Sequence, residues 1–444
     1  MDKIASQIFD HAAEVGSKGL EPKVLDEMKK RIADSLITSY GAMSAPPVSI
    51  EKKALLPSSG KLNSPVYFTD MKASVDISTF INGSMTRYLD FNDTYLSKEA
   101  LHPSDNVPPI LSMAYAKDLS GLDAAKAVSV AYDVVGALSD AVSIRDRGWD
   151  HVTYISISAA AGLGLLLGFS HEKYENLINL AINNNISLRQ TRAGELSMWK
   201  GCTASDASRN SVFAALLALE GFTGPSPIFT GEMGFFKQVS GEFELNLKPG
   251  KVLRTMIKNY PVEYHAMSAA EVALNLREEI SGRIEKVEVE TFEVAHKIII
   301  KDPEKLRPRT RETADHSMPY IVAFTLKNGA PTPTSYDDIY LKDREILRII
   351  DVSSYKVTSR FNEMYPENLP VKIRVTTDKG AFEQEMDVPK GHFKKPYTWE
   401  DLKNKGKSVI GENNAKILVD FMKNFEKKSV RELFEVISDV NFKG

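Results

Sequence analysis

Apolar side chains recur at helical spacing through roughly the first 260 residues of the chain. One face of the first predicted helix carries Ile4, Ile8, Ala12 and Val15. A second helix is predicted to start at Pro22, because proline is favoured in the first turn, and to end before Pro46. Further long segments rich in alanine and leucine occupy residues 108–141, 156–169 and 206–220. This part of the chain is therefore predicted to be a succession of packed helices.

The pattern changes after residue 266. Beyond one more helix, Val287, Val289 and Thr291 alternate with charged residues, which is the two-residue period of a half-buried strand. A second alternating run over 371–375 turns at Asp378-Lys-Gly380 and returns through 382–386, which predicts a β-hairpin. The last 40 or so residues are again helical in pattern. We predict a mainly α fold in which 1–266, completed by 397–444, forms an all-helical domain and 267–396 a smaller α+β lid domain.

Composition narrows the possible partners and the cellular compartment. The formal net charge of -3 over 444 residues gives no reason to expect nucleic acid as a partner. The single cysteine, Cys202, excludes an intramolecular disulfide and an iron–sulfur cluster held by several thiolates of this chain. No secretory signal precedes the first helix, and the apolar stretch 152–169 is interrupted by Thr153, Tyr154, Ser156 and Ser158. We therefore expect a cytoplasmic protein with no membrane partner.

Familiar cofactor and nucleophile motifs are missing from the sequence. Gly162, Gly164 and Gly168 do not have the spacing of a dinucleotide-binding loop, follow no predicted strand, and are better explained by close helix packing. The sequence also contains no P-loop, HExxH, GxSxG or cysteine pair for zinc. Chemistry must therefore reside in other polar residues.

Five short polar segments interrupt the apolar pattern. Pro103 keeps His102 out of the α conformation, which places that imidazole in a loop. The other histidine segments likewise lie at breaks between predicted elements, where a side chain can reach a cleft. The five segments are Tyr88-Leu-Asp90-Phe-Asn-Asp93-Thr94-Tyr95 with His102-Pro-Ser-Asp105-Asn106; Arg147-Gly-Trp-Asp150-His151; Trp199-Lys200-Gly201; Lys258-Asn-Tyr260-Pro-Val-Glu263-Tyr-His265; and Arg311-Glu-Thr-Ala-Asp315-His316-Ser-Met-Pro-Tyr320.

Each segment taken alone also has a purely structural interpretation. Asp90 and Asp93 could be helix-capping or surface carboxylates, and Asp105 or Asp315 could cap helices. A lone histidine is more often a satisfied structural residue than a catalyst, and Lys200 alone is more often exposed to solvent than functional. The Asp/His set could also bind a divalent metal, although no two members have helical i, i+4 or zinc-finger spacing. We predict no metal and no organic cofactor.

Taken together, the histidine motifs resemble the MmgE/PrpD family, which includes 2-methylcitrate dehydratases and cis-aconitate decarboxylases. The resemblance follows the order of the motifs over nearly the whole chain. His102-Pro-Ser-Asp-Asn, Asp150-His151 and Asp315-His316 look like the 2-methylcitrate dehydratase branch. The resemblance implies a helical domain with an α+β lid, a homodimer and a site in the cleft between domains. It places the family's catalytic residues on His102, His151, His265, Asp90 and Tyr320, and its substrate-binding residues on Lys200 and Thr94.

The implied enzyme is a hydro-lyase that dehydrates 2-methylcitrate, with citrate as an alternative substrate, as a step of propionate catabolism in the methylcitrate cycle. Removing a proton beside a carboxylate builds negative charge, and hydroxide leaves poorly unless it is protonated, so a base, an acid and cations are needed. Histidine can take either proton-transfer role near neutral pH. Lys200 offers a charge for a carboxylate, as could Arg145, Arg192 or Lys258. Decarboxylation of cis-aconitate, epimerisation of a related dicarboxylate and a non-enzymatic binding role stay as alternatives.

Overall fold

The computed structural model describes residues 2–46, 48–49, 52, 62–194 and 196–439. The chain divides into two compact units. The first, here called the helical unit, comprises Met1–Arg192, Trp199–Ile257 and Thr398–Gly444, and the second, the mixed unit, comprises Ala193–Met198 and Lys258–Tyr397. The predicted boundary at 266 thus differs from the observed one after Ile257, which places His265 in the mixed unit. The short piece 193–198 of the mixed unit was not anticipated.

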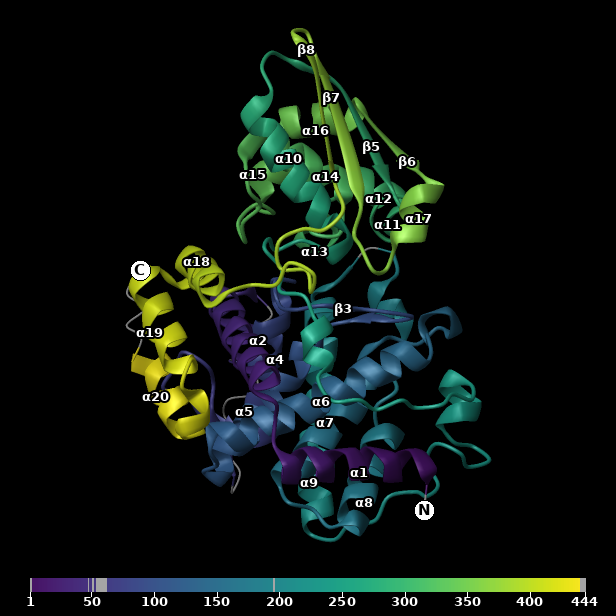
Figure 1. Ribbon diagram of the computed structural model, residues 1–444, viewed down its shortest axis with the longest axis vertical. Helices are drawn as coiled ribbons and strands as arrows, with labels where there is room; N and C mark the ends of the chain where they lie inside the picture. Colours follow the sequence, from purple (N-terminus) through teal and green to yellow (C-terminus); the bar gives the residue numbers. More distant parts are fainter. Residues whose placement is uncertain (1, 47, 50–51, 53–61, 195, 440–444) are drawn as a thin grey trace. The chain divides into compact units, whose positions relative to one another are not determined.

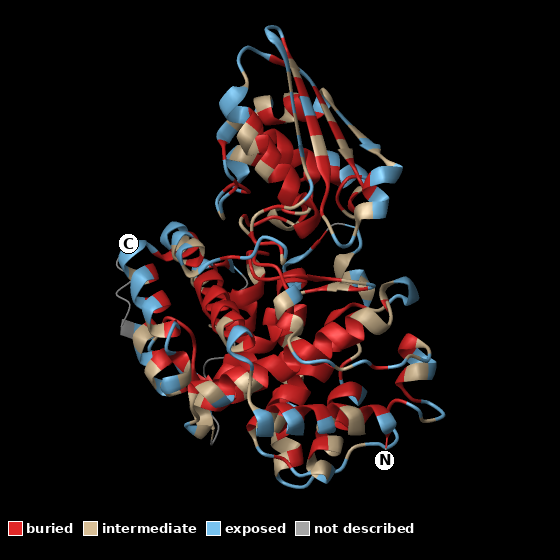
Figure 2. Ribbon diagram, in the orientation of Figure 1, coloured by how far each residue is buried: buried red, intermediate tan, exposed pale blue. Residues whose placement is uncertain are grey.

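The helical unit is built around α7, which spans Val152–Leu166 and packs against α6 and α9 (Figure 1). Most of α6 and α7 is buried in Figure 2. Close approach requires small residues here, because a Cβ at Gly162 would lie 2.7 Å from the carbonyl oxygen of Ala127 on α6. Gly162 and Gly164 therefore serve helix packing, as the sequence predicted, whereas Gly168 has open space around it and a left-handed backbone (φ 61°). The α-helices of this unit whose bounds lie within the described residues are α1 (Lys3–Lys18), α2 (Pro22–Gly41), α4 (Val75–Tyr88), α5 (Val107–Lys117), α6 (Gly121–Ala141), α7, α8 (His171–Asn183), α9 (Thr203–Leu219), α18 (Trp399–Ile410), α19 (Glu412–Met422) and α20 (Val430–Asp439).

Two short strand pairs interrupt the helical unit, so it is not all-helical as predicted. Strands β1 (Asn63–Pro65) and β2 (Lys72–Ser74) form one antiparallel pair. Strands β3 (Tyr95–Leu96) and β4 (Ala100–Leu101) form the other. Strands this short bury too little surface for a clear two-residue pattern, which explains why the sequence did not reveal them.

The mixed unit contains a four-stranded sheet in the order β6-β5-β7-β8. Strand β5 (Ile284–Thr291) pairs in parallel with β6 (Ser353–Val357) and antiparallel with β7 (Val371–Thr377), which forms the predicted hairpin with β8 (Gly380–Met386). Its helices are α10 (Met267–Glu279), α11 (Glu293–Ile299), α12 (Pro303–Leu306), α13 (Arg311–Ala314), α14 (Met318–Asn328), α15 (Asp338–Leu341), α16 (Arg344–Asp351) and α17 (Ser359–Met364).

One face of this sheet is covered by helices (Figure 1). On β7, Val371, Ile373 and Val375 are buried, whereas Lys372 and Arg374 between them are not. Helix α10 packs on β7 and β8 and on α14, and α14 packs on α16. The prediction of a mainly α fold with a smaller α+β part is confirmed. Among the helices of the described residues, none combines the length and apolar character needed to cross a bilayer.

Candidate active site

The turn after α4 brings Asp90 into the interior of the helical unit. Asp90 adopts a left-handed backbone conformation (φ 50°), which aspartate tolerates better than most residues and which often marks functional sites. Its side chain is buried, and the Arg87 guanidinium one helical turn earlier donates to its carboxylate. Asp93 is buried as well. The interpretation of these two residues as surface carboxylates is therefore wrong.

Two contacts from distant segments fix the turn that carries Asp90. Lys405 on α18 donates 2.7 Å to the carbonyl oxygen of Phe91, and its ammonium lies 2.6 Å from the Asp34 carboxylate on α2. Asp93 accepts from the backbone N–H of Ser104 at 2.9 Å and from the hydroxyl of Tyr132 at 2.8 Å. The C-terminal helices thus help to hold the turn. Sequence reasoning missed Lys405, because a helical lysine gives no local sign that its ammonium is buried.

His102 lies directly opposite Thr94 because the β3–β4 pair places the two residues at the end of one short ladder. Its backbone is extended (φ -120°, ψ 94°), as the following proline predicted. Nδ1 lies 2.7 Å from the carbonyl oxygen of Asp93 and 3.3 Å from Oγ1 of Thr94. Since a carbonyl oxygen only accepts, Nδ1 carries a proton. Nε2 is then directed towards Asp90, whose Oδ1 lies 3.8 Å away.

His151 occupies the N-terminal boundary of α7, next to Asp150. Its Nδ1 lies 3.3 Å from Oδ1 of Asp150, which also accepts from the backbone N–H of Val152 at 3.1 Å. Oδ2 of Asp150 lies 2.8 Å from Nε of Arg192. An ionised Asp150 favours a proton on Nδ1 of His151, which leaves a lone pair on Nε2. That Nε2 is buried and has no hydrogen-bond partner among the described residues.

Burial sets the protonation state of His151. Only 5% of the residue is exposed. Desolvation lowers its pKa well below the ordinary value; nearby Arg192 and Arg87 act in the same direction, and the Asp150 carboxylate only partly opposes them. His151 is therefore neutral at neutral pH, with an unused acceptor atom. The predicted alternative, a satisfied structural histidine, does not describe it.

Four of the residues predicted for the site, Asp90, Thr94, His102 and His151, form one polar cluster in the helical unit. The imidazole rings of His102 and His151 lie 6.0 Å apart, centroid to centroid, and Asp90 and Thr94 contact His102. Lys200 is 2% exposed, so its interpretation as a solvent-exposed lysine is wrong. The segment that carries Lys200 packs on α4, because a Cβ at Gly201 would lie 3.4 Å from the Tyr88 ring.

Three further residues, Arg87, Arg192 and Asp105, belong to this cluster. Sequence analysis assigned no site role to Arg87 or Asp105, and it named Arg192 only by its proximity in sequence. Arg87 pairs with Asp90, and Arg192 pairs with Asp150. Asp105, three residues after His102, is buried, and burial raises its pKa to about 7. It accepts a 3.4 Å hydrogen bond from Asn92 and caps no helix. The only sequence signal for Asp105 was its place in the His102-Pro-Ser-Asp-Asn motif.

The predicted site residues of the mixed unit are satisfied by neighbours in that unit. His265 has Nδ1 2.7 Å from Glu263 and Nε2 3.2 Å from the hydroxyl of Tyr365. Burial alone would raise the pKa of Glu263, but the neighbouring His265 imidazole holds that pKa at about 2. The Tyr320 hydroxyl donates to the carbonyl oxygen of Ser335 at 2.7 Å.

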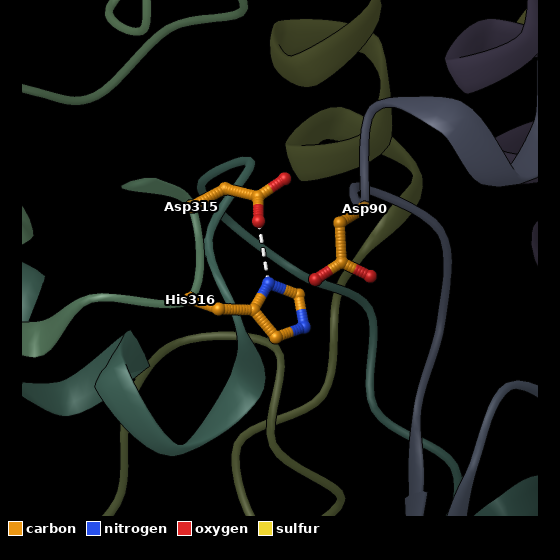
Figure 3. Close-up of side chains that lie close together, drawn as sticks. All are labelled: Asp90, Asp315 and His316. Carbon is orange, nitrogen blue, oxygen red and sulfur yellow. Dashed lines mark hydrogen bonds and ion pairs between the residues drawn. The ribbon is translucent and has the colours of Figure 1, made fainter. Parts of the chain in front are cut away.

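The Asp315-His316 motif also forms a pair within the mixed unit. Figure 3 shows the hydrogen bond between Nδ1 of His316 and a carboxylate oxygen of Asp315. Asp315 is the C-terminal boundary residue of α13, and its backbone carbonyl accepts from the N–H of Glu263 at 2.8 Å. The prediction that His265 and Tyr320 share one pocket with the helical unit's histidines stays a prediction.

Family models match both parts of the chain. The MmgE/PrpD N-terminal domain matches residues 6–248, and the MmgE/PrpD C-terminal domain matches residues 260–416. The chain belongs to the MmgE/PrpD family. Its similarity to 2-methylcitrate dehydratase of Escherichia coli (strain K12) is 30% identity over 347 residues, which cover 72% of this chain and 71% of that protein.

Other MmgE/PrpD relatives carry related names. The mitochondrial 2-methylcitrate dehydratase of Yarrowia lipolytica is 30% identical over 354 residues, which cover 73% of this chain and 68% of the relative. An alkylcitrate dehydratase of a fungal species is 26% identical over 358 residues, which cover 72% and 70% of the two chains. The curated relatives named here are all dehydratases of citrate derivatives.

Proposed function

We propose that this member of the MmgE/PrpD family is a hydro-lyase that dehydrates 2-methylcitrate, with citrate as an alternative substrate. One observation carries the proposal: a buried, neutral His151 with an unused Nε2 lies 6.0 Å from the ring of His102. A dehydration needs two proton-transfer groups in different states, and environments that hold two histidines differently supply them. The names of the relatives support the substrate class.

In this proposal His151 is the general base. Its Nε2 removes the proton from the carbon bearing the methyl group, and Asp150 stabilises the imidazolium that forms, through Nδ1 at 3.3 Å. Burial increases the benefit of that ion pair, because charges interact more strongly away from water. The negative charge that develops on the substrate requires fixed cations nearby, and Lys200 is proposed to bind a substrate carboxylate.

His102 is the general acid in the same proposal. Its Nδ1 proton is donated to the carbonyl oxygen of Asp93, so a second proton on Nε2 is the one available to the leaving hydroxide. Asp90, 3.8 Å from Nε2, provides the negative charge that holds such a proton. Thr94 completes the contacts that orient the ring.

Further expectations belong to the same proposal. We propose that His265 and Tyr320 contribute from the mixed unit acting as a lid, that the protein needs no metal or organic cofactor, and that it acts as a cytoplasmic homodimer in the methylcitrate cycle. Decarboxylation of cis-aconitate uses the same substrate skeleton and similar proton-transfer groups. The dehydratase names of the relatives favour loss of water over loss of carbon dioxide.

The deciding experiment is an incubation of the purified protein with 2-methylcitrate, citrate and cis-aconitate. We expect the ultraviolet absorbance of a conjugated tricarboxylate to appear from 2-methylcitrate, more slowly from citrate, and no carbon dioxide from cis-aconitate. Carbon dioxide release without dehydration would assign the decarboxylase reaction instead. Activity that survives exhaustive chelation is the expected result for a cofactor-free enzyme, and loss restored only by added iron or zinc would refute that part.

A further inference from the structure

Arg192 is a largely buried arginine of the helical unit. It ends the 3-10 segment Arg189–Arg192, and only 10% of its side chain is exposed. Its Nε forms an ion pair with Oδ2 of Asp150 at 2.8 Å, and both Nε and Nη2 are buried without a hydrogen-bond partner among the described residues. An unsatisfied N–H of a charged group away from water is costly, so such a group in a native fold calls for a ligand.

Arg192 and His151 pair with the same carboxylate. One carboxylate, that of Asp150, contacts both side chains, through Oδ1 to His151 and through Oδ2 to Arg192. The charge of Arg192 also contributes to the lowered pKa of His151, which places the guanidinium within electrostatic range of the imidazole. A cation with a spare N–H therefore adjoins a base with a spare lone pair.

Two other buried cations of the helical unit, Arg87 and Lys405, are already bound to protein groups. The Arg87 guanidinium donates to the Asp90 carboxylate, and the Lys405 ammonium to the carbonyl of Phe91 with Asp34 beside it. Arginine characteristically binds carboxylates through two parallel N–H groups. Asp150 contacts only the Nε side of Arg192, so the fork is half used.

We infer that Arg192 is a substrate-binding residue that anchors one carboxylate of an anionic substrate beside His151. The inference rests on the proposed function, which supplies a substrate with three carboxylates. Asp150 then has two roles: it orients the His151 base, and it holds the Arg192 fork so that Nη2 is presented to the substrate. Binding one carboxylate next to the base would fix which carbon of the substrate faces Nε2.

The test measures binding of tricarballylate, an unreactive tricarboxylate without the hydroxyl group, by titration calorimetry. Loss of a charge-assisted hydrogen bond from a buried arginine should weaken binding about 10- to 100-fold in Arg192→Gln. Arg192→Lys keeps the charge without the fork and should give an intermediate value. Arg431→Gln is the matched control, because Arg431 is a half-exposed arginine of the same unit that pairs with Asp118, and it should bind as the wild type does.

A second variant separates anchoring from a merely structural role. Asp150→Asn keeps the shape of the side chain and an amide oxygen that can still accept from Arg192, so it should bind tricarballylate no more weakly than the wild type, although its turnover falls. Binding within twofold of the wild type in folded Arg192→Gln, or no binding of tricarballylate by the wild type, would overturn the inference. Tight binding that depends on Arg192 in a protein that dehydrates none of the substrates would refute the proposed function and leave the anchor standing.

Discussion

The two units hold their candidate histidines in opposite ways. In the helical unit, His151 has one ring nitrogen beside Asp150 and the other without a partner among the described residues. In the mixed unit, His265 has Glu263 on one nitrogen and the Tyr365 hydroxyl on the other. Both imidazoles are buried. Burial alone therefore does not distinguish a histidine available for chemistry from one engaged in structure.

The difference lies in how many polar atoms are left unsatisfied. A protein normally satisfies nearly all buried donors and acceptors, because each unsatisfied group costs stability. Among the described residues, several side-chain atoms of the helical unit break that rule, including Nε2 of His151, Oδ2 of Asp150, Nε and Nη2 of Arg192, and Oδ2 of Asp105. Their clustering is what a site built for a polar ligand requires. The mixed unit's His265 and Tyr320 instead complete networks of their own.

The largest effect should come from removing the unused nitrogen. His151→Gln should reduce turnover of 2-methylcitrate by about two to four orders of magnitude, the range usual for a general base. Its free energy of unfolding should change by less than about 1 kcal/mol, since Nε2 makes no hydrogen bond to lose. Turnover is measured by product absorbance and stability by urea denaturation.

His171→Gln is the control for this substitution. His171 lies at the start of α8 in the same unit and packs against Phe9 in a tilted arrangement, with ring centroids 4.6 Å apart. Turnover should be unaffected in this control. Near-normal turnover in His151→Gln would show that the unused nitrogen has no role in the reaction. The contrast between His151 and His265 would then have no functional meaning.

The second prediction concerns the pH dependence of stability through Asp105. Burial raises the pKa of this carboxyl to about 7, so between about pH 4 and pH 7 the folded protein keeps a proton that the unfolded chain releases. Stability is therefore lost as the pH rises through that window. Asp105→Asn removes the effect. The free energy of unfolding of the variant relative to the wild type should rise by about 4 kcal/mol between those limits.

Denaturation at a series of pH values gives this difference directly, and taking it between variant and wild type cancels the titration of all other groups. Asp123→Asn is the control, because Asp123 is an exposed capping-box carboxylate on α6. A constant difference across the window would mean that Asp105 is ionised in the folded protein. Asp105 would then no longer count among the unsatisfied groups that distinguish the helical unit from the mixed unit.

The sequence predicted the helical and strand patterns well where side chains repeat over several turns or along a hairpin. It also identified Asp90, Thr94, His102 and His151 as residues of one site, because side chains at breaks between helices are not needed for core packing. It did not reveal Lys405, because a buried cation in an ordinary polar helix looks like a solvated one, and it named Arg192 only by its proximity in sequence. It gave no sign that the hydroxyl of Tyr320 is taken by Ser335, since that contact depends on a turn 15 residues away.

The third prediction tests whether the hydrogen-bonded pair of Glu263 and His265 stabilises the mixed unit. The pKa of Glu263 is about 2 instead of 4.5, so its ionised form stabilises the mixed unit by about 3 kcal/mol. This contribution is complete above about pH 4.5 and disappears as the pH falls towards about 2, because the unfolded chain binds the proton first. Glu263→Gln should therefore cost about 3 kcal/mol at neutral pH and little at pH 2 to 3.

Thermal and urea unfolding at neutral and acidic pH measure this cost. Glu288→Gln is the control, because Glu288 is an exposed carboxylate on β5 with a lysine neighbour, and exposed ion pairs contribute little. An unchanged stability in Glu263→Gln would mean that the Glu263–His265 pair does not stabilise the fold. His265 would then be as available for chemistry as His151.

The smallest predicted effect is the sharpest test of how the helical unit prepares its base. In Asp150→Asn the shape of the side chain is kept, but an amide beside Nδ1 can donate as well as accept, so the proton of the neutral imidazole is no longer held on Nδ1. The fraction of molecules with a lone pair on Nε2 falls, and we expect turnover to drop about 10- to 100-fold, less than in His151→Gln because the base itself remains. The acid limb of the rate profile should also move to lower pH, since Asp150 is the charge that raises the pKa of His151 against burial and the neighbouring arginines. An acid limb at unchanged pH together with normal turnover would mean that Asp150 only holds the start of α7, and that the tautomer of His151 is set elsewhere.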